Sequence, residues 1–257
     1  MMRTTSLLVA ALAAIFMRPT PPADTPPGPG VPLTLAEERA KRIKDLRYDL
    51  HISIPAEASA PVTGRTTISF QLTDASRPLA LDFAPRDGVR GARAGQKPVI
   101  LTTSVDHLIV PASELREGRN EISIDFVAGN ASLNRNPEFL YTIFVPARAH
   151  LSVPCFDQPD LKAHWTLGLE IPAGWQALAN GAEIARSEAN GRTTLKFAET
   201  PPLSTYVFAF AAGRFSIETG ERAGRTFRMF HRETDAAKVA RNRDIVFDLH
   251  PAALAWL

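Results

Sequence analysis

The stretch VPCFDQPDLKAHW, residues 153–165, gathers side chains that could do chemistry. It holds the only cysteine of the chain, Cys155, followed by Asp157, Asp160 and His164. A cysteine activated by a neighbouring histidine is a nucleophile, and histidine combined with carboxylates or a thiolate can bind zinc. The first question is therefore whether these residues form an active site or only a turn.

The order of residues in this stretch favours a turn. Asp157 can cap the backbone N–H of Asp160, and Pro159 is tolerated in a first helical turn because its missing N–H costs nothing there. Cys155 lies between a proline and a phenylalanine. Such apolar surroundings are typical of a buried, unreactive thiol with a high pKa. We predict a capped turn over residues 157–163 that leads into a strand.

The histidines do not supply a catalytic motif. The chain has no His-x-x-x-His pair with an adjacent glutamate, no Gly-x-Ser-x-Gly elbow and no glycine-rich phosphate loop. The histidines are His51, His107, His150, His164, His231 and His250. We therefore predict that the chain holds no catalytic residue, no metal ligand and no cofactor of its own.

Most of the chain alternates apolar and polar residues, as half-buried strands do. In residues 46–54 every second residue is apolar and His51 falls on the polar face. Asn190-Gly191 predicts a type I′ hairpin. The other predicted strand faces are Ile68–Leu72, Leu79–Phe83, Ile122–Phe126, Trp165–Ile171 and the fully buried Tyr206–Ala212. This pattern predicts an all-β fold, an antiparallel saddle-like β-sandwich.

Residues 1–24 have the pattern of a secretory signal peptide, in which Arg3 precedes an unbroken apolar run from Leu7 to Met17. The run is too short for a stable membrane span, which needs about 20 apolar residues. We therefore expect secretion to the periplasm, and then an extended Pro/Gly-rich linker over residues 25–33. A net charge of +2 without a basic run argues against a nucleic-acid partner.

Two helical signals flank the β region. Thr34 and Glu37 have the spacing of a capping box, which predicts a short helix that runs to about Lys44. Thr234 is the expected cap of a second helix, and Pro251 should break or kink it.

The predicted β domain therefore spans residues 34–232. The last residues of the chain, Ala252–Leu257, are apolar. We interpret residues 233–257 as the beginning of a helical, catalytic domain that is otherwise missing, and we expect them to expose an apolar interface.

Four stretches, in order, resemble the aminopeptidase N family of zinc metallopeptidases. The segment PCFDQPDLKA is similar to the family's PCFDEPDLKA, and PPLSTYVFAFAAGRF resembles its PPMSTYLLAFVVGDF-type strand. RIKDLRYDLHISI resembles the family's opening strand, and IPAGWQALANG resembles its hP-x-x-W-x-A-x-S-N-G hairpin. Together these matches cover nearly all of residues 35–216, which makes the set specific.

The resemblance implies the family's N-terminal, saddle-shaped β domain. In the family a catalytic domain follows, where His-Glu-x-x-His and a distant glutamate bind zinc and the glutamate between the histidines is the general base. This sequence contains neither that motif nor the Gly-x-Met-Glu-Asn-type loop. The resemblance thus implies zinc in the parent enzyme, with ligands outside this chain. It also implies two partners, the catalytic domain of the same polypeptide and the peptide substrate.

The family further implies one substrate contact in this domain. Many members read TQFEPTDAR before the Pro-Cys pair, and its glutamate binds the α-amine of the peptide. The matching run here is TIFVPARAH, residues 142–150, in which Ile143 and Val145 stand at the glutamine and glutamate positions. We expect Ile143, Phe144 and Val145 to line the entrance of the first substrate pocket. The alternative is an apolar strand end that packs the sheet.

Two functions remain open. The first is the N-terminal, substrate-pocket-bordering domain of a secreted zinc aminopeptidase that removes N-terminal residues from peptides, with this chain inactive alone. The second is a non-catalytic periplasmic β-sandwich that binds a peptide, a glycan or a partner protein. An open reading frame beyond Leu257 that encodes His-Glu-x-x-His would favour the first, and a stop codon there would favour the second.

Overall fold

The computed structural model describes residues 27–257. The predicted signal peptide, residues 1–24, and the first part of the predicted linker lie outside the described residues. Within residues 27–257, no helix combines the length and the apolar character that crossing a bilayer requires.

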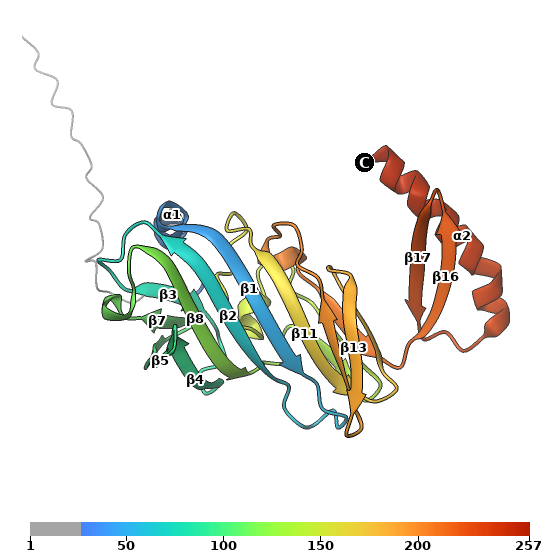
Figure 1. Cartoon of the computed structure of the whole chain (residues 1–257), viewed down its shortest axis with the longest axis horizontal. Helices are drawn as coiled ribbons and strands as arrows, with labels where there is room; N and C mark the ends of the chain where they lie inside the picture. The colour runs from blue at the N-terminus through green and yellow to red at the C-terminus, as the bar shows by residue number, and fades with distance from the viewer. Residues whose placement is uncertain (1–26) are drawn as a thin grey trace, which may run out of the picture.

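An eight-stranded sheet forms the body of the molecule (Figure 1). In spatial order its strands are β13 (Glu183–Ala189), β14 (Arg192–Phe197), β11 (His164–Pro172), β1 (Ile43–Ser53), β2 (Thr63–Leu72), β8 (Gly118–Val127), β4 (Val89–Ala94) and β5 (Lys97–Pro98). Neighbouring strands are antiparallel except β1 and β11, which run parallel with Tyr48 opposite Trp165. The predicted saddle-like sandwich is confirmed apart from this pair. No tight turn joins β1 to β11, so hairpin geometry does not set their relative direction.

Smaller sheets complete the fold. The four-stranded sheet has the order β12 (Gln176–Ala179), β15 (Phe210–Gly213), β10 (Phe139–Thr142) and β9 (Leu133–Asn136). The three-stranded sheet has the order β3 (Leu79–Asp82), β7 (His107–Val110) and β6 (Thr102–Ser104), and the two-stranded sheet pairs β16 (Ser216–Arg222) with β17 (Arg225–His231). Short 3₁₀ helices lie in the connections: η1 (Ala112–Glu114), η2 (Ala149–Leu151) and η3 (Thr205–Val207).

The apolar faces predicted from the alternation are buried in one continuous core. In β1, Tyr48 and Ile52 are buried, whereas His51 is exposed on the opposite face, as predicted. Tyr48 stacks on Trp165 with ring centroids 4.0 Å apart, and Trp165 stacks on Phe208 at 4.2 Å. Apolar burial and aromatic stacking therefore join β1 and β11 of the large sheet to the segment before β15.

At one edge of the large sheet, β13 and β14 form the predicted hairpin. Asn190 and Gly191 have φ angles of 53° and 71°, which the type I′ turn requires. Ile184 on the edge strand β13 is 66% exposed, so this edge is open to solvent.

The predicted strand over Tyr206–Ala212 is wrong in its first half. That half forms the 3₁₀ helix η3, and β15 begins only at Phe210. Tyr206 and Val207 are exposed rather than buried on both sides. The physical reason lies next to them, because the Thr205 hydroxyl donates to the Asp157 carboxylate at 2.6 Å and fixes a tight turn there.

The first helix, α1 (Leu33–Arg42), forms where expected, but its ends differ from the prediction. Pro32 precedes the helix, and its carbonyl accepts the first helical hydrogen bond without any side-chain cap. Thr34 lies inside the helix, so the predicted Thr34–Glu37 capping box is wrong. The helix also ends before Lys44, because β1 begins directly after it.

The second helix, α2 (Ala236–Trp256), is capped by Asp235, whose carboxylate accepts from the Lys238 N–H at 3.1 Å. The predicted Thr234 cap is therefore wrong by one residue. Pro251 lies within the helix and does not end it.

The turn before this proline is held in two ways. The His250 ring bonds to the Val246 carbonyl at 2.7 Å. Phe247 is buried against β16, where a Cβ on Gly220 would lie 2.5 Å from its ring. This tertiary contact outweighs the helix-breaking tendency of proline.

The β16–β17 hairpin and α2 stand apart from the large sheet and pack on each other (Figure 1). Arg232 links them to the four-stranded sheet, because it pairs with Glu138 and lies 4.4 Å from the centroid of the Phe139 ring. The structure thus groups residues 216–231 with α2, whereas the predicted division between residues 34–232 and 233–257 stays a prediction.

Candidate functional site

Asp157 of the PCFDQPDLKA segment is an acceptor for two other parts of the chain. Its carboxylate accepts from the Thr205 hydroxyl at 2.6 Å, and from the ring Nδ1 and backbone N–H of His150 at 2.7 and 3.2 Å. A turn follows at residues 158–161, but Asp157 does not cap Asp160, so this predicted cap is wrong. A buried carboxylate needs strong donors on both oxygens, and His150 and Thr205 supply them.

Cys155 lies in the centre of the fold. It is fully buried, and its backbone pairs with that of Asp82 through N–H···O bonds of 2.7 and 3.1 Å. Burial, together with the charges of Asp157 and Asp82, raises the pKa of the thiol well above its usual value. The thiol therefore stays protonated and inaccessible, as expected for a structural cysteine.

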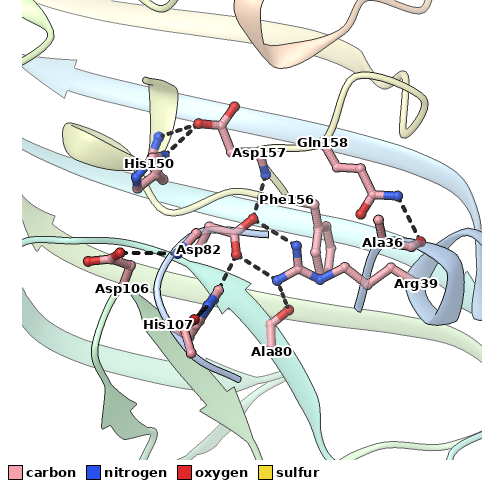
Figure 2. A network of polar contacts seen from close by, with 12 residues as sticks. Ala36, Arg39, Ala80, Asp82, Asp106, His107, His150, Phe156, Asp157 and Gln158 are labelled. Atoms are coloured by element: carbon pink, nitrogen blue, oxygen red, sulfur yellow. Dashed lines mark hydrogen bonds and ion pairs between the residues drawn. The ribbon is translucent and has the colours of Figure 1, made fainter. Parts of the chain in front are cut away.

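A buried ion pair connects this segment to α1 (Figure 2). The Asp82 carboxylate accepts from the Arg39 guanidinium at 2.6 and 2.8 Å, from His107 Nδ1 at 2.8 Å and from the Asp157 N–H at 2.7 Å. Arg39 also lies over the Phe156 ring, 5.4 Å from its centroid. Burial alone would raise the pKa of Asp82, but the charge of Arg39 and the hydrogen bonds from His107 and Arg39 outweigh it and lower the pKa.

The pairing of Arg39 with Asp82 was not predicted from the sequence. Arg39 lies on a short, charged helix, where arginine ordinarily points to solvent. The available signal was Asp82, an acidic residue within the apolar strand LALDF. A carboxylate in a buried strand requires a cation or several donors, so Asp82 predicted a partner but not its identity.

The histidines do not form a metal centre. Five of the six pair with one carboxylate each: His51 with Asp49, His107 with Asp82, His150 with Asp157, His164 with Glu199, and His231 with Glu218. The sixth, His250, bonds to the Val246 carbonyl. Residues 27–257 contain no group of three or more ligand-type side chains that could hold a metal ion. A zinc site takes at least three protein ligands, so the described residues do not fit zinc.

A polar hollow of about 900 Å³ lies on the outer face of the large sheet. Gly168 lies opposite His51 in the strand register, and a Cβ on Gly168 would lie 2.5 Å from the His51 ring. The charges in the hollow compensate each other: Arg65 bonds Asp125 at 2.5 and 3.0 Å, and His51 lies 3.3 Å from Asp49. Sequence reasoning did not find this hollow, although a glycine inside a strand pattern is a signal of close approach.

The predicted substrate contacts lie at the end of β10, on the four-stranded sheet. Tyr141, Ile143 and Val145 point outward and are 39%, 41% and 60% exposed, whereas Phe144 is only 2% exposed and belongs to the core. The structure therefore presents Ile143 and Val145 at the surface and holds Phe144 inside. Their role in lining a substrate pocket stays a prediction.

Comparisons with known proteins agree with this architecture. The family model of the Peptidase M1 N-terminal domain matches residues 44–207, which is more than half of the chain. A probable M1 family aminopeptidase of Encephalitozoon cuniculi is 30% identical over 203 residues, covering 71% of this chain and 23% of the relative. Aminopeptidase M1-A of rice is 30% identical over 196 residues, covering 66% of this chain and 22% of the relative.

Among solved structures, the M1 zinc metallopeptidase of Deinococcus radiodurans has a similar fold, with a TM-score of 0.61 at 20% sequence identity. The match covers 73% of this chain and 47% of that one. The chain spans less than a quarter of the length of the two curated relatives. On the evidence of the domain match at residues 44–207, the chain belongs to the M1 peptidase family and carries its N-terminal domain.

Proposed function

We propose that this chain is the N-terminal domain of a secreted zinc aminopeptidase that removes N-terminal residues from peptides. The observation that carries the proposal is the match of residues 44–207 to the M1 N-terminal domain. The zinc ligands and the general base then belong to a catalytic domain of the same polypeptide, and the described residues supply neither. Secretion to the periplasm rests on the signal-peptide pattern of residues 1–24.

Sequencing of the gene beyond the codon for Leu257 tests the parent activity directly. The proposal expects an open frame that encodes His-Glu-x-x-His. A stop codon, together with a folded product that does not hydrolyse peptides, would instead favour the non-catalytic binding module. The polar hollow of about 900 Å³ on the outer face of the large sheet supports this second candidate as a place where a ligand could lie.

In the parent enzyme, this domain would border the substrate pocket. The residues that do so would be the outward-facing ones of β10 and of the segment that directly follows it. Tyr141, Ile143 and Val145 share one exposed face, and the apolar Val207 is also exposed. In this proposal the face lies toward the catalytic domain and the first side chain of the peptide.

Val145→Glu in the complete enzyme tests this placement. A carboxylate there would form a charge-assisted hydrogen bond with the peptide's α-ammonium, which is worth about 1.5–3 kcal/mol before desolvation costs. We expect KM for free-amine peptides to fall by about ten- to hundredfold, with N-acetylated peptides remaining unbound. Ile184→Glu on the exposed edge strand β13 is the matched control and should leave KM unchanged. An unchanged KM in a folded Val145→Glu enzyme would contradict the proposal that Val145 lines the substrate pocket.

A further inference from the structure

The segment that precedes α1 is tied to the β domain. Gly28 and Gly30 lie within the predicted free linker, yet the Gly28 carbonyl accepts from His107 Nε2 at 3.0 Å. The Gly30 N–H donates to the Asp106 carboxylate at 3.3 Å. Asp106 and His107 are adjacent, at the start of β7 (Figure 2). Part of the predicted linker is therefore bonded to the β domain.

His107 is bonded at both ring nitrogens. Its Nδ1 lies 2.8 Å from Asp82 Oδ1, and its Nε2 lies 3.0 Å from the Gly28 carbonyl oxygen. A carbonyl oxygen only accepts, and the Asp82 carboxylate, ionised beside Arg39, also only accepts. Both ring nitrogens must therefore donate, which requires the imidazolium form of His107. Its side chain is fully buried, so water does not supply alternative partners.

The charges around His107 favour this form. Asp82 faces it from β3, Asp106 precedes it in the chain, and Arg39 of α1 shares the Asp82 carboxylate. Beyond Asp82 lies the second pair, Asp157 with His150. Burial and Arg39 act to lower the pKa of His107, but the hydrogen bonds that its ring donates to Asp82 and Gly28 and the charge of Asp82 outweigh them and raise it.

His150 provides the contrast within the same network. Its Nδ1 faces Asp157 at 2.7 Å, and its side chain retains some exposure. A neutral imidazole with its proton on Nδ1 keeps this bond, so proton loss from His150 breaks no contact. Proton loss from His107, by contrast, leaves a lone pair facing an oxygen and removes one of its two bonds.

We propose that His107 is a proton-dependent latch that fastens the chain at Gly28 to the β domain and releases it there when its ring becomes neutral, while Gly30 stays bonded to Asp106. The Asp82 bond is retained on proton loss because it is made to a charge within the buried network, so the Gly28 bond is lost. The latch is closed at low pH. It opens as the pH rises through the folded-state pKa of His107, which lies above the unfolded value of about 6.5. This inference stands independently of the proposed aminopeptidase function.

Site-directed spin labelling of the whole chain tests the latch. Pro27→Cys places a label beside Gly28, and buried Cys155 does not compete for the reagent. Electron paramagnetic resonance should show an immobilised label at about pH 5.5 and severalfold faster rotational motion of the label at about pH 9. The midpoint should coincide with loss of the His107 proton, read by ¹⁵N chemical shifts of the ring in the same sample.

Two variants distinguish release at His107 from a general increase in mobility of the chain with pH. His107→Gln, whose amide can donate to Gly28 at every pH, should abolish the pH dependence of the label. His150→Gln, the matched control, should preserve it. Label mobility that does not follow the His107 titration, or a ring that is neutral at about pH 5.5, would overturn the proposal. The ring shifts of the chain with native His107 decide the question even where His107→Gln fails to fold.

Discussion

The two helices, α1 and α2, are attached to the molecule in opposite ways. The buried residues of α1 are two arginines, Arg39 and Arg42, whereas the buried residue of α2 is Phe247. Arg39 pairs with Asp82, and Arg42 donates to backbone carbonyls of the loop before β3. One helix is thus positioned by buried, directional hydrogen bonds, and the other by one buried apolar side chain together with exposed ion pairs to β16, such as Arg222 with Asp248 and Arg243 with Glu218.

The two helices also differ in the apolar surface that they expose. The terminal guanidinium nitrogens of Arg39 and Arg42 donate to Asp82 and to backbone carbonyls of the β domain, whereas Arg39 Nε has no partner among the described residues. In α2, by contrast, apolar side chains are exposed along the described chain. They include Ile245 at 57%, Leu249 at 62%, Leu254 at 49% and Trp256 at 86% exposure. Under the proposed function this surface is where the catalytic domain packs.

The largest expected effect comes from breaking the α1 attachment. Asp82→Ala removes a carboxylate that accepts four hydrogen bonds and leaves Arg39 buried without its partner. We expect a loss of about 5 kcal/mol in the free energy of unfolding, at the upper end for a broken buried pair. Guanidinium unfolding followed by circular dichroism measures it. Asp125→Ala, which breaks an exposed pair with Arg65, should cost less than about 1 kcal/mol, and equal losses would refute the contrast.

A smaller and local effect follows from breaking the α2 attachment. Phe247→Ala should cost roughly 3 kcal/mol, at the lower end for a buried phenylalanine because much of α2 is exposed. The loss should appear as faster hydrogen exchange in α2 and in β16–β17, while the large sheet keeps its protection. Ile245→Ala on the exposed face should change the free energy of opening, as read from hydrogen exchange, by less than about 0.5 kcal/mol. Uniform loss of protection throughout the domain would show that α2 is not a separate unit.

The smallest effect concerns pH, which should act on the α1 attachment and not on the Phe247 contact. The folded-state pKa of Asp82 is lowered, so its stabilisation is present above the unfolded pKa of about 3.9 and is lost as the pH falls through the folded value. The pKa of His107 is raised, so its contribution is present below about 6.5 and is lost as the pH rises through its folded value. Protection of α1 amides, taken as exchange relative to the intrinsic rate at each pH, should therefore be greatest between about pH 4 and 6.5, and a flat profile of protection would contradict this assignment.

The sequence predicted the strands better than their attachments. Alternation identified the buried faces of β1, β2, β8 and β11, because one side of each strand faces the core. The Asn190-Gly191 hairpin followed from residues that tolerate positive φ. These features depend on neighbours along the chain, so the sequence carries them directly.

The features that were missed depend on partners distant in sequence. Arg39 lies 43 residues from Asp82, and Thr205 lies 48 residues from Asp157. The predicted cap of α1 was misplaced by two residues, because the Pro32 carbonyl begins that helix without a side-chain cap. The predicted cap of α2 was misplaced by one, because the Asp235 carboxylate serves in place of Thr234. For the candidate site, the resemblance placed Ile143, Phe144 and Val145 together at a pocket entrance, whereas the structure exposes Ile143 and Val145 and holds Phe144 in the core.

The central claim is that this chain carries the N-terminal domain of a zinc aminopeptidase without its catalytic centre. The most direct test is to incubate the purified chain with zinc and follow both bound metal and hydrolysis of aminoacyl-arylamide substrates. We predict no stoichiometric zinc and no turnover, because the sequence contains no His-Glu-x-x-His and residues 27–257 hold no group of three ligand-type side chains that could bind a metal ion. Chelator-sensitive turnover by this chain alone would contradict the account.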